Sequence, residues 1–148
     1  MKKICLTFLI FHFTLFICHA QDASEEIETL LETSAVTYAQ AARFLLEASD
    51  AMAINDREAA FRHAAEQNWL PKNAAANGPA RLDGLSLLIM RSFNIKGGIM
   101  YSLVKNPHYA YLELVYKNII QGRSDPAMHV SGERLLFFTS RALSLQRN

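Results

Sequence analysis

Cysteine is almost absent from this sequence, and the two that occur, Cys5 and Cys18, both lie near the N-terminus. An apolar run at residues 4–17 follows a pair of lysines, and small residues stand at the −3 and −1 positions of the junction that follows. This order is typical of a secretory signal peptide, so we expect residues 1–20 to be removed by cleavage after Ala20. The mature chain would then have no thiol, which excludes disulfides, cysteine metal sites and cysteine nucleophiles.

A strong net charge is also lacking. The formal net charge of +1 becomes −1 when Lys2 and Lys3 leave with the signal peptide. A chain so close to neutral has no overall field to attract nucleic acid or anionic lipid, and we expect no nucleic-acid partner. The run at 4–17 is short for a bilayer span, and no later apolar run reaches membrane length. We therefore expect no integral membrane segment after cleavage.

A lipid anchor on Cys18 is the alternative to cleavage after Ala20, although Ile17 stands where lipoprotein sites carry a small residue. With cleavage, the protein is expected to be secreted across the inner membrane and to be periplasmic or associated with the cell envelope. The remaining residues, 21–148, are enough for one ordinary small domain with its own core.

Apolar residues at helical spacing predict an all-α fold. In one segment, Ala41, Phe44, Leu45 and Ala48 recur at i, i+3, i+4 and i+7, which places them on one helix face. Capping signals mark the helix starts, with a Thr37–Gln40 capping box and caps at Ser24, Asp56 and Ser131. The expected helices are 25–33, 37–49, 57–68, 83–93, 109–117 and 131–143. Residues 99–103 are expected as a brief extended piece, and 145–148 should fray.

Two helix–loop–helix units align when the chain is shifted by fifty residues, which places Asn68 on Asn118. The stripe Leu85, Leu88, Ile89, Ser92 then falls on Leu135, Phe138, Thr139, Ala142. A shift of forty-four brings the stripe of helix 37–49 onto the same positions. The units cover about 22–50, 56–93 and 107–143, and the short helix at Glu25 takes the place of an outer helix in the first.

Repeated units that cannot each bury their own apolar face share one core. We therefore expect helices 37–49, 83–93 and 131–143 to meet as an inner bundle. Helices 57–68 and 109–117 should lie outside it.

The last unit carries the motifs of a known family. Tyr109-Ala110-Tyr111, the loop Asn118-Ile119-Ile120-Gln121-Gly122-Arg123-Ser124-Asp125-Pro126 and the ending Arg141-Ala142-Leu143 resemble an S-layer homology repeat. That family has an aromatic-Ala-aromatic start, a "GII-G-x-x-D" loop and an "R-A-L" end. The resemblance is good over 109–143, fair over 58–93 and partial over 36–49. It implies a pseudo-threefold helical domain, with two full units and one partial unit, that binds cell-wall polymer or peptidoglycan.

The chain departs from the family at the "TRAE" start of the inner helix. The corresponding residues are 37–40, 81–84 and 131–134. The arginine in the second position contacts polymer in the family, and it is absent from all three units.

Five residues around the last loop are the predicted ligand site: Arg123, Asp125, Ser131, Glu133 and Arg134. In this interpretation Arg123, Glu133 and Arg134 converge at a shallow groove and hydrogen-bond a sugar or acid group. The structural alternative is a capped loop with solvated charges. There Gly122 takes a left-handed conformation, and Asp125-Pro126 makes a turn.

Signals of catalysis, metals and cofactors are few. Gly97-Gly98 lacks the strand–glycine–helix context and the lysine of a phosphate loop, and no Ser-His-Asp order with a nucleophile turn is visible. His63 and Glu66 share a helix face, but a metal needs three or four ligands. Trp69 is expected as a core anchor, with a stacking platform as the alternative. Tyr101, Tyr109, Tyr111 and Tyr116 are expected in half-buried packing, with a carbohydrate-stacking surface as the alternative.

The sequence thus predicts a non-catalytic envelope module without metal or cofactor, whose partner is an envelope protein or a cell-wall glycan. One alternative keeps the fold but docks a partner protein on the apolar, aromatic surface around Ile99–Tyr111. Another is a small secreted hydrolase, which would need a deep cleft with a perturbed acid or a histidine beside a hydroxyl.

Overall fold

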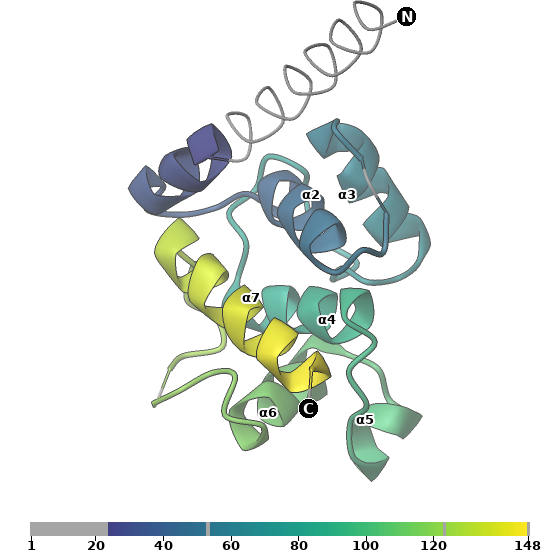
Figure 1. The fold of residues 1–148 in the computed structure, drawn as a ribbon. Helices are drawn as coiled ribbons and strands as arrows, with labels where there is room; N and C mark the ends of the chain where they lie inside the picture. Colours follow the sequence, from purple (N-terminus) through teal and green to yellow (C-terminus); the bar gives the residue numbers. More distant parts are fainter. Residues whose placement is uncertain (1–23, 53, 123, 148) are drawn as a thin grey trace, which may run out of the picture.

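The computed structural model describes residues 24–147, apart from 53 and 123, and every regular element in these residues is a helix (Figure 1). Residues 24–32 are helical. They are followed by α2 (Tyr38–Ala48), α3 (Arg57–Glu66), α4 (Leu82–Ser92), α5 (Ile99–Leu103), α6 (Pro107–Tyr116) and α7 (Gly132–Gln146). The all-α prediction is confirmed. The predicted signal peptide lies outside the described residues.

Short polar side chains start three of these helices as predicted. At α2, the Thr37 hydroxyl accepts from the Gln40 amide while the Gln40 side chain accepts from the Thr37 amide, which completes the capping box. Asp56 accepts from the Ala59 amide at 2.9 Å, and Ser131 accepts from the Arg134 amide at 3.4 Å. Each cap satisfies an amide that the first helical turn leaves without a partner.

One element and several boundaries differ from the prediction: α3 ends at Glu66 rather than 68, and most other ends shift by one residue. Helix α6 begins at Pro107 rather than 109, because Asn106 caps it and proline fits the first helical position. Residues 99–103, expected as extended, form α5, in which the Ser102 amide and hydroxyl both donate to the Gly98 carbonyl. Helix α7 continues to Gln146 instead of fraying, and the Gln146 side-chain amide donates to the Phe93 carbonyl at 2.8 Å.

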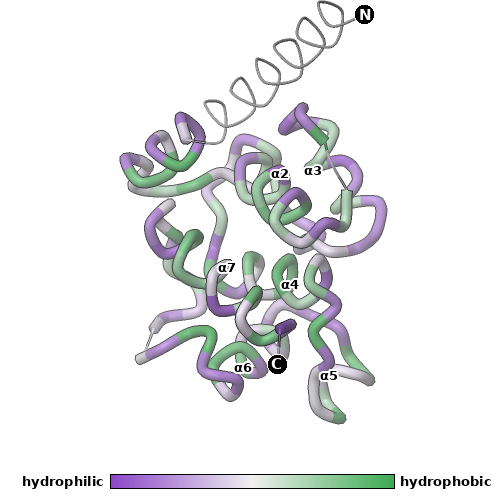
Figure 2. Tube along the Cα trace, in the orientation of Figure 1, coloured by the Kyte–Doolittle hydropathy of each residue, from purple (hydrophilic) through white to green (hydrophobic). Residues whose placement is uncertain are grey.

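The core forms where the helices cross. Helix α2 packs against both α4 and α7, α3 covers α2, and α6 covers α4. Fully buried side chains at these crossings include Leu45, Leu88, Leu114 and Leu135. Figure 2 shows apolar residues along α2 and α4, and again on α5 at the edge of the fold. Glu26, in the helical segment 24–32, forms an ion pair with Arg43 of α2.

Three backbone hydrogen bonds close a ring between the segments that precede α2, α4 and α7. The Val36 amide donates to the Val130 carbonyl (2.9 Å), the Val130 amide to the Ala80 carbonyl (3.0 Å), and the Ala80 amide to the Val36 carbonyl (2.8 Å). All three residues are fully buried. They are separated by the same intervals, forty-four and fifty residues, that align the apolar stripes of the three helices. The ring therefore brings the starts of these helices together.

The helix ends show the same intervals. Asp50 and Asn94, forty-four residues apart, follow α2 and α4 in a left-handed conformation, with φ of 53° and 49°. Asn68 and Asn118, fifty residues apart, do the same after α3 and α6, with φ of 56° and 57°. Asparagine and aspartate tolerate this conformation better than other residues with a Cβ, so the sequence ends these helices with matched residue types.

Candidate functional site

The predicted ligand site lies on the 124–128 loop and at the start of α7, and side-chain hydrogen bonds hold this loop against the helix. Arg123 lies outside the described residues. Asp125 is exposed, its Oδ1 accepts from the Ala127 amide at 2.8 Å, and its carbonyl accepts from the Met128 amide at 3.1 Å. These are the bonds of a turn. Gly122 has φ of 77°, the left-handed conformation expected of it.

Arg134 faces this loop and holds it against α7. Its Nη2 donates to the Ser124 hydroxyl at 3.0 Å, its Nη1 contacts the Met128 sulfur at 2.9 Å, and its guanidinium stacks over the Phe138 ring at 5.4 Å. Tyr111 braces the same loop, because its hydroxyl donates to the Ser124 carbonyl at 2.7 Å. The structure thus brings Arg134 together with the 124–128 loop.

Ser131 and Glu133 flank Arg134 without joining it in a polar cluster. The Ser131 side chain is occupied as the cap of α7. Glu133 is exposed and makes no hydrogen bond or ion pair to another described residue.

The residues that the sequence comparison aligned with the second position of the "TRAE" motif are all buried. These residues are Tyr38, Leu82 and Gly132. Tyr38 accepts from the Arg81 amide at 3.3 Å, and burial raises the pKa of its hydroxyl. At Gly132 even a methyl group would collide with the Leu30 carbonyl.

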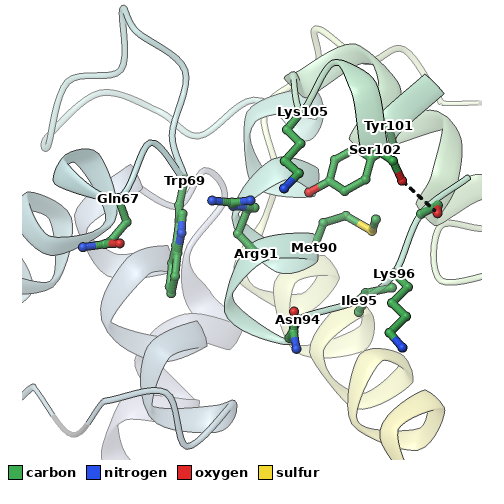
Figure 3. A pocket seen from close by; sticks show the side chains of 11 residues that line it. Gln67, Trp69, Met90, Arg91, Asn94, Ile95, Lys96, Tyr101, Ser102 and Lys105 are labelled. Atoms are coloured by element: carbon green, nitrogen blue, oxygen red, sulfur yellow. Dashed lines mark hydrogen bonds between the residues drawn. The ribbon is translucent and has the colours of Figure 1, made fainter. Parts of the chain in front are cut away.

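A pocket of about 530 Å³ lies elsewhere, where the end of α3, the end of α4 and α5 meet (Figure 3). Arg91, Lys96 and Lys105 line it, together with the aromatic residues Trp69 and Tyr101. None of the described residues that line it carries a carboxylate. In Figure 3 the Arg91 and Lys105 side chains and the Tyr101 hydroxyl point toward one another, while Lys96 lies apart from them.

The three cationic side chains of this pocket are without ion-pair partners among the described residues. Arg91, Lys96 and Lys105 make no ion pair and no side-chain hydrogen bond within the described part of the chain. The nearby carboxylate, that of Glu113, accepts from the Gly98 amide at 2.7 Å. An anion entering the pocket would therefore find cationic donors that have no other partner.

The Tyr101 hydroxyl is a buried polar group without a hydrogen-bond partner among the described residues. The residue is 5% exposed. Burial raises the pKa of this hydroxyl above its usual value of 10.0, Arg91 lowers it, and Glu113 raises it. A buried donor of this kind costs free energy unless an acceptor reaches it.

Sequence reasoning missed this pocket. Trp69 was expected as a core anchor, and it does pack against the core, with the His63 ring edge-on at 5.7 Å, but it also lines the pocket. The available signal was charge distribution, because the sequence has no acidic residue between Asp83 and Glu113, whereas Arg91, Lys96 and Lys105 fall in that interval.

The four tyrosines that were candidates for a stacking surface are used separately. Tyr101 is buried in the pocket, Tyr109 and Tyr111 are half-buried, and Tyr116 is 83% exposed.

A second, smaller pocket of about 300 Å³ lies near the start of α4. Arg81 and Asp83 line it and neutralise one another through an ion pair at 2.9 Å. It therefore lacks the free positive charge of the larger pocket.

Two searches of the described residues bear on other site types. They contain no group of three or more His, Cys, Asp or Glu side chains that could hold a metal ion. No helix among them has the length and apolar character needed to cross a bilayer.

Comparisons with protein-family models, with curated proteins and with solved structures found no match to this chain.

Proposed function

We propose that the mature protein is a non-catalytic binding or scaffolding module of the cell envelope, built from three units similar to S-layer homology repeats, that associates with peptidoglycan or cell-wall polymer. The observation that carries this proposal is the hydrogen-bonded ring of Val36, Ala80 and Val130. Its members are spaced by the intervals that align the repeat-like helices in the sequence. A fold that joins the three repeat-like segments at one point supports the family resemblance by backbone geometry, independently of the sequence motifs.

The helix ends add support. Asp56 and Asn106, fifty residues apart, cap α3 and α6 through bonds of 2.9 Å each to the amide three residues on. The left-handed residues after these helices are separated by the same fifty residues. Matched starts and matched stops are what two copies of one unit would retain.

The mode of binding must differ from that of the family. Because Tyr38, Leu82 and Gly132 occupy the arginine position and are buried, the usual polymer contact has no counterpart here. A ligand would have to use other side chains.

Co-sedimentation with insoluble peptidoglycan sacculi tests the proposal. We expect the mature protein to enter the pellet and to be released by soluble cell-wall fragments, with chitin as the neutral insoluble control. A protein that stays in the supernatant with sacculi and with purified wall polymer would contradict the proposal. Arg123→Ala tests the predicted loop site separately: unchanged pelleting would remove Arg123 from the contact.

Docking of a partner protein is the second candidate, and one observation favours it. Helix α5 exposes Ile99 (78%), Met100 (60%) and Leu103 (76%) at the edge of the fold. Apolar side chains grouped in this way are common at protein interfaces. Crosslinking in intact cells, compared between the wild-type protein and Ile99→Ser/Leu103→Ser, would reveal a partner that depends on α5. Identical crosslinks from both proteins would count against this surface.

A further inference from the structure

We infer that the pocket between α3, α4 and α5 binds an acidic saccharide, a sugar carrying a carboxylate or a phosphate. This inference rests on the proposed glycan-binding function and names the site and the chemical class of its ligand. It starts from a pocket that three cationic side chains and no acidic side chain of the described residues line, and from the buried Tyr101 hydroxyl, which has no hydrogen-bond partner among those residues.

The charge selects an anion. Arg91 and Lys105 direct their cationic groups toward the same space, and Lys96 lies apart from them (Figure 3). Carboxylate and phosphate oxygens are the acceptors that bind such groups most strongly, through hydrogen bonds assisted by charge. Because no acidic side chain lines the wall, the ligand would be the counter-ion that the protein itself does not supply.

The Tyr101 hydroxyl supplies a directed donor. It lies beside the end of Lys105 in Figure 3, and it is buried and unpartnered. An anionic oxygen placed between Arg91 and Lys105 could accept from this hydroxyl and remove the cost of leaving it unsatisfied. A hydrogen bond from this hydroxyl would fix the position of a bound anion, which a loosely attracted counter-ion would lack.

The remaining wall fits a sugar ring better than a bare anion. Trp69 lies beyond Arg91 in Figure 3, and the polar side chains of Gln67, Asn94 and Ser102 also line the pocket. The volume of about 530 Å³ is within the range of small-molecule sites and far exceeds that of an inorganic phosphate. A saccharide would stack its ring on the Trp69 indole. Its hydroxyl and amide substituents would form hydrogen bonds with the polar side chains.

Titration of the mature protein with four probes tests the ligand class. N-acetylmuramic acid carries a carboxylate, glucose 6-phosphate a phosphate, N-acetylglucosamine no charge, and inorganic phosphate no ring. Trp69 is the only tryptophan, so its fluorescence reports directly on the pocket. We expect at least one acidic sugar to change this fluorescence and to bind about tenfold more tightly than both the neutral sugar and inorganic phosphate.

The two acidic probes also distinguish the source of the negative charge, since the tighter one identifies a carboxylate or a phosphate ligand. The inference is overturned if neither acidic sugar binds. It is also overturned if the neutral sugar, or inorganic phosphate, binds as tightly as the acidic sugars do.

Matched variants test the residues. Arg91→Gln and Lys105→Gln should each weaken binding of the acidic sugar about tenfold. Arg57→Gln and Lys117→Gln, at the opposite ends of α3 and α6 from the pocket, should leave it unchanged. Tyr101→Phe should weaken binding without lowering the melting temperature, which separates loss of a donor from loss of the fold. If the pocket variants bind like the wild type, the assignment is wrong.

The two proposals can fail separately. If sacculi do not retain the protein but acidic sugars bind in a manner that depends on Arg91 and Lys105, the pocket assignment stands and the envelope function falls. If an Arg91→Gln/Lys105→Gln protein still pellets with sacculi like the wild type, the envelope function stands and the pocket is not its site.

Discussion

The Tyr101 hydroxyl lowers the stability of the free protein while it provides a donor for a ligand. A buried hydroxyl without an acceptor costs about 1–3 kcal/mol relative to one that is satisfied. Phenylalanine would fill the same space without that cost. We therefore expect Tyr101→Phe to raise the free energy of unfolding by about 1 kcal/mol, measured by urea denaturation without ligand. A clear loss of stability would show that the hydroxyl has a partner in the free protein.

The same tyrosine links stability to pH. Burial raises the pKa of both Tyr38 and Tyr101 above 10.0. Above pH 10 the unfolded chain therefore releases these protons while the folded chain retains them. The unfolded state then binds fewer protons, so the free energy of unfolding falls as the pH rises. In urea titrations below and above pH 10, Tyr101→Phe should show a shallower fall than the wild type. Equal slopes would mean that Tyr101 ionises freely in the fold.

Gly132 is constrained by space. Its amide donates to the Thr33 carbonyl at 2.9 Å, and an added methyl would collide with the Leu30 carbonyl. Because backbone atoms cannot move aside as a flexible side chain can, we expect Gly132→Ala to destabilise the protein by about 1–3 kcal/mol. Glu133→Ala, next to it on the exposed surface, is the control and should be nearly neutral. Thermal unfolding of the two variants measures the difference.

At the scale of the element, helix starts could be predicted from the sequence and two segments could not. Short polar residues at 37, 56 and 131 cap a helix through local bonds, so the relevant physics lies within four residues. Helix α5 was missed because Ile99-Met100-Tyr101 has the composition of an extended piece. Its conformation depends on burial of Tyr101 and on the Glu113–Gly98 bond, which come from elsewhere in the chain.

The end of α7 was missed for a related reason. The apolar stripe stops near Leu143, but the helix continues until Gln146 reaches the Phe93 carbonyl. A contact between residues so far apart in the chain has no signal in the local pattern.

The matched caps of α3 and α6 give a prediction for these elements. Asp56→Ala and Asn106→Ala each remove the acceptor for one orphan amide, and each should lower the free energy of unfolding by about 1 kcal/mol. Asp56→Asn and Asn106→Asp keep an acceptor and should retain most of the stability. Urea denaturation of the four variants measures both pairs. If the alanine and cap-retaining variants were equally stable, these side chains would not act as caps.

At the scale of the whole molecule, the all-α class could be predicted and the pocket could not. The predicted site lay on one loop, where the residues share a local motif, and there Arg134 serves to brace the loop. The pocket instead combines Trp69, Arg91 and Lys105, which come from three segments. Their approach depends on how the chain turns back after α4 and through α5, and a repeat alignment contains no information about a feature present in one unit alone.

The ring of Val36, Ala80 and Val130 implies that the domain unfolds as one unit. It joins the early, middle and late segments of the chain, so opening one segment removes hydrogen bonds from the others. We expect Trp69 fluorescence, which reports on the middle unit, and helical circular dichroism, which reports on all of them, to give one coincident transition. Two separate transitions would contradict this coupling.

Val130→Pro tests the ring itself, because proline removes the amide that donates to the Ala80 carbonyl. Val130→Ala is the matched control, since it keeps that amide while losing buried methyl groups. Leaving a buried carbonyl without its donor costs about 1–3 kcal/mol, so proline should be less stable than alanine by that amount. Because the bond couples units, both probes should shift together in Val130→Pro. If the circular dichroism transition shifts while the Trp69 transition does not, the last segment can open alone. The ring would then connect the segments without coupling their unfolding.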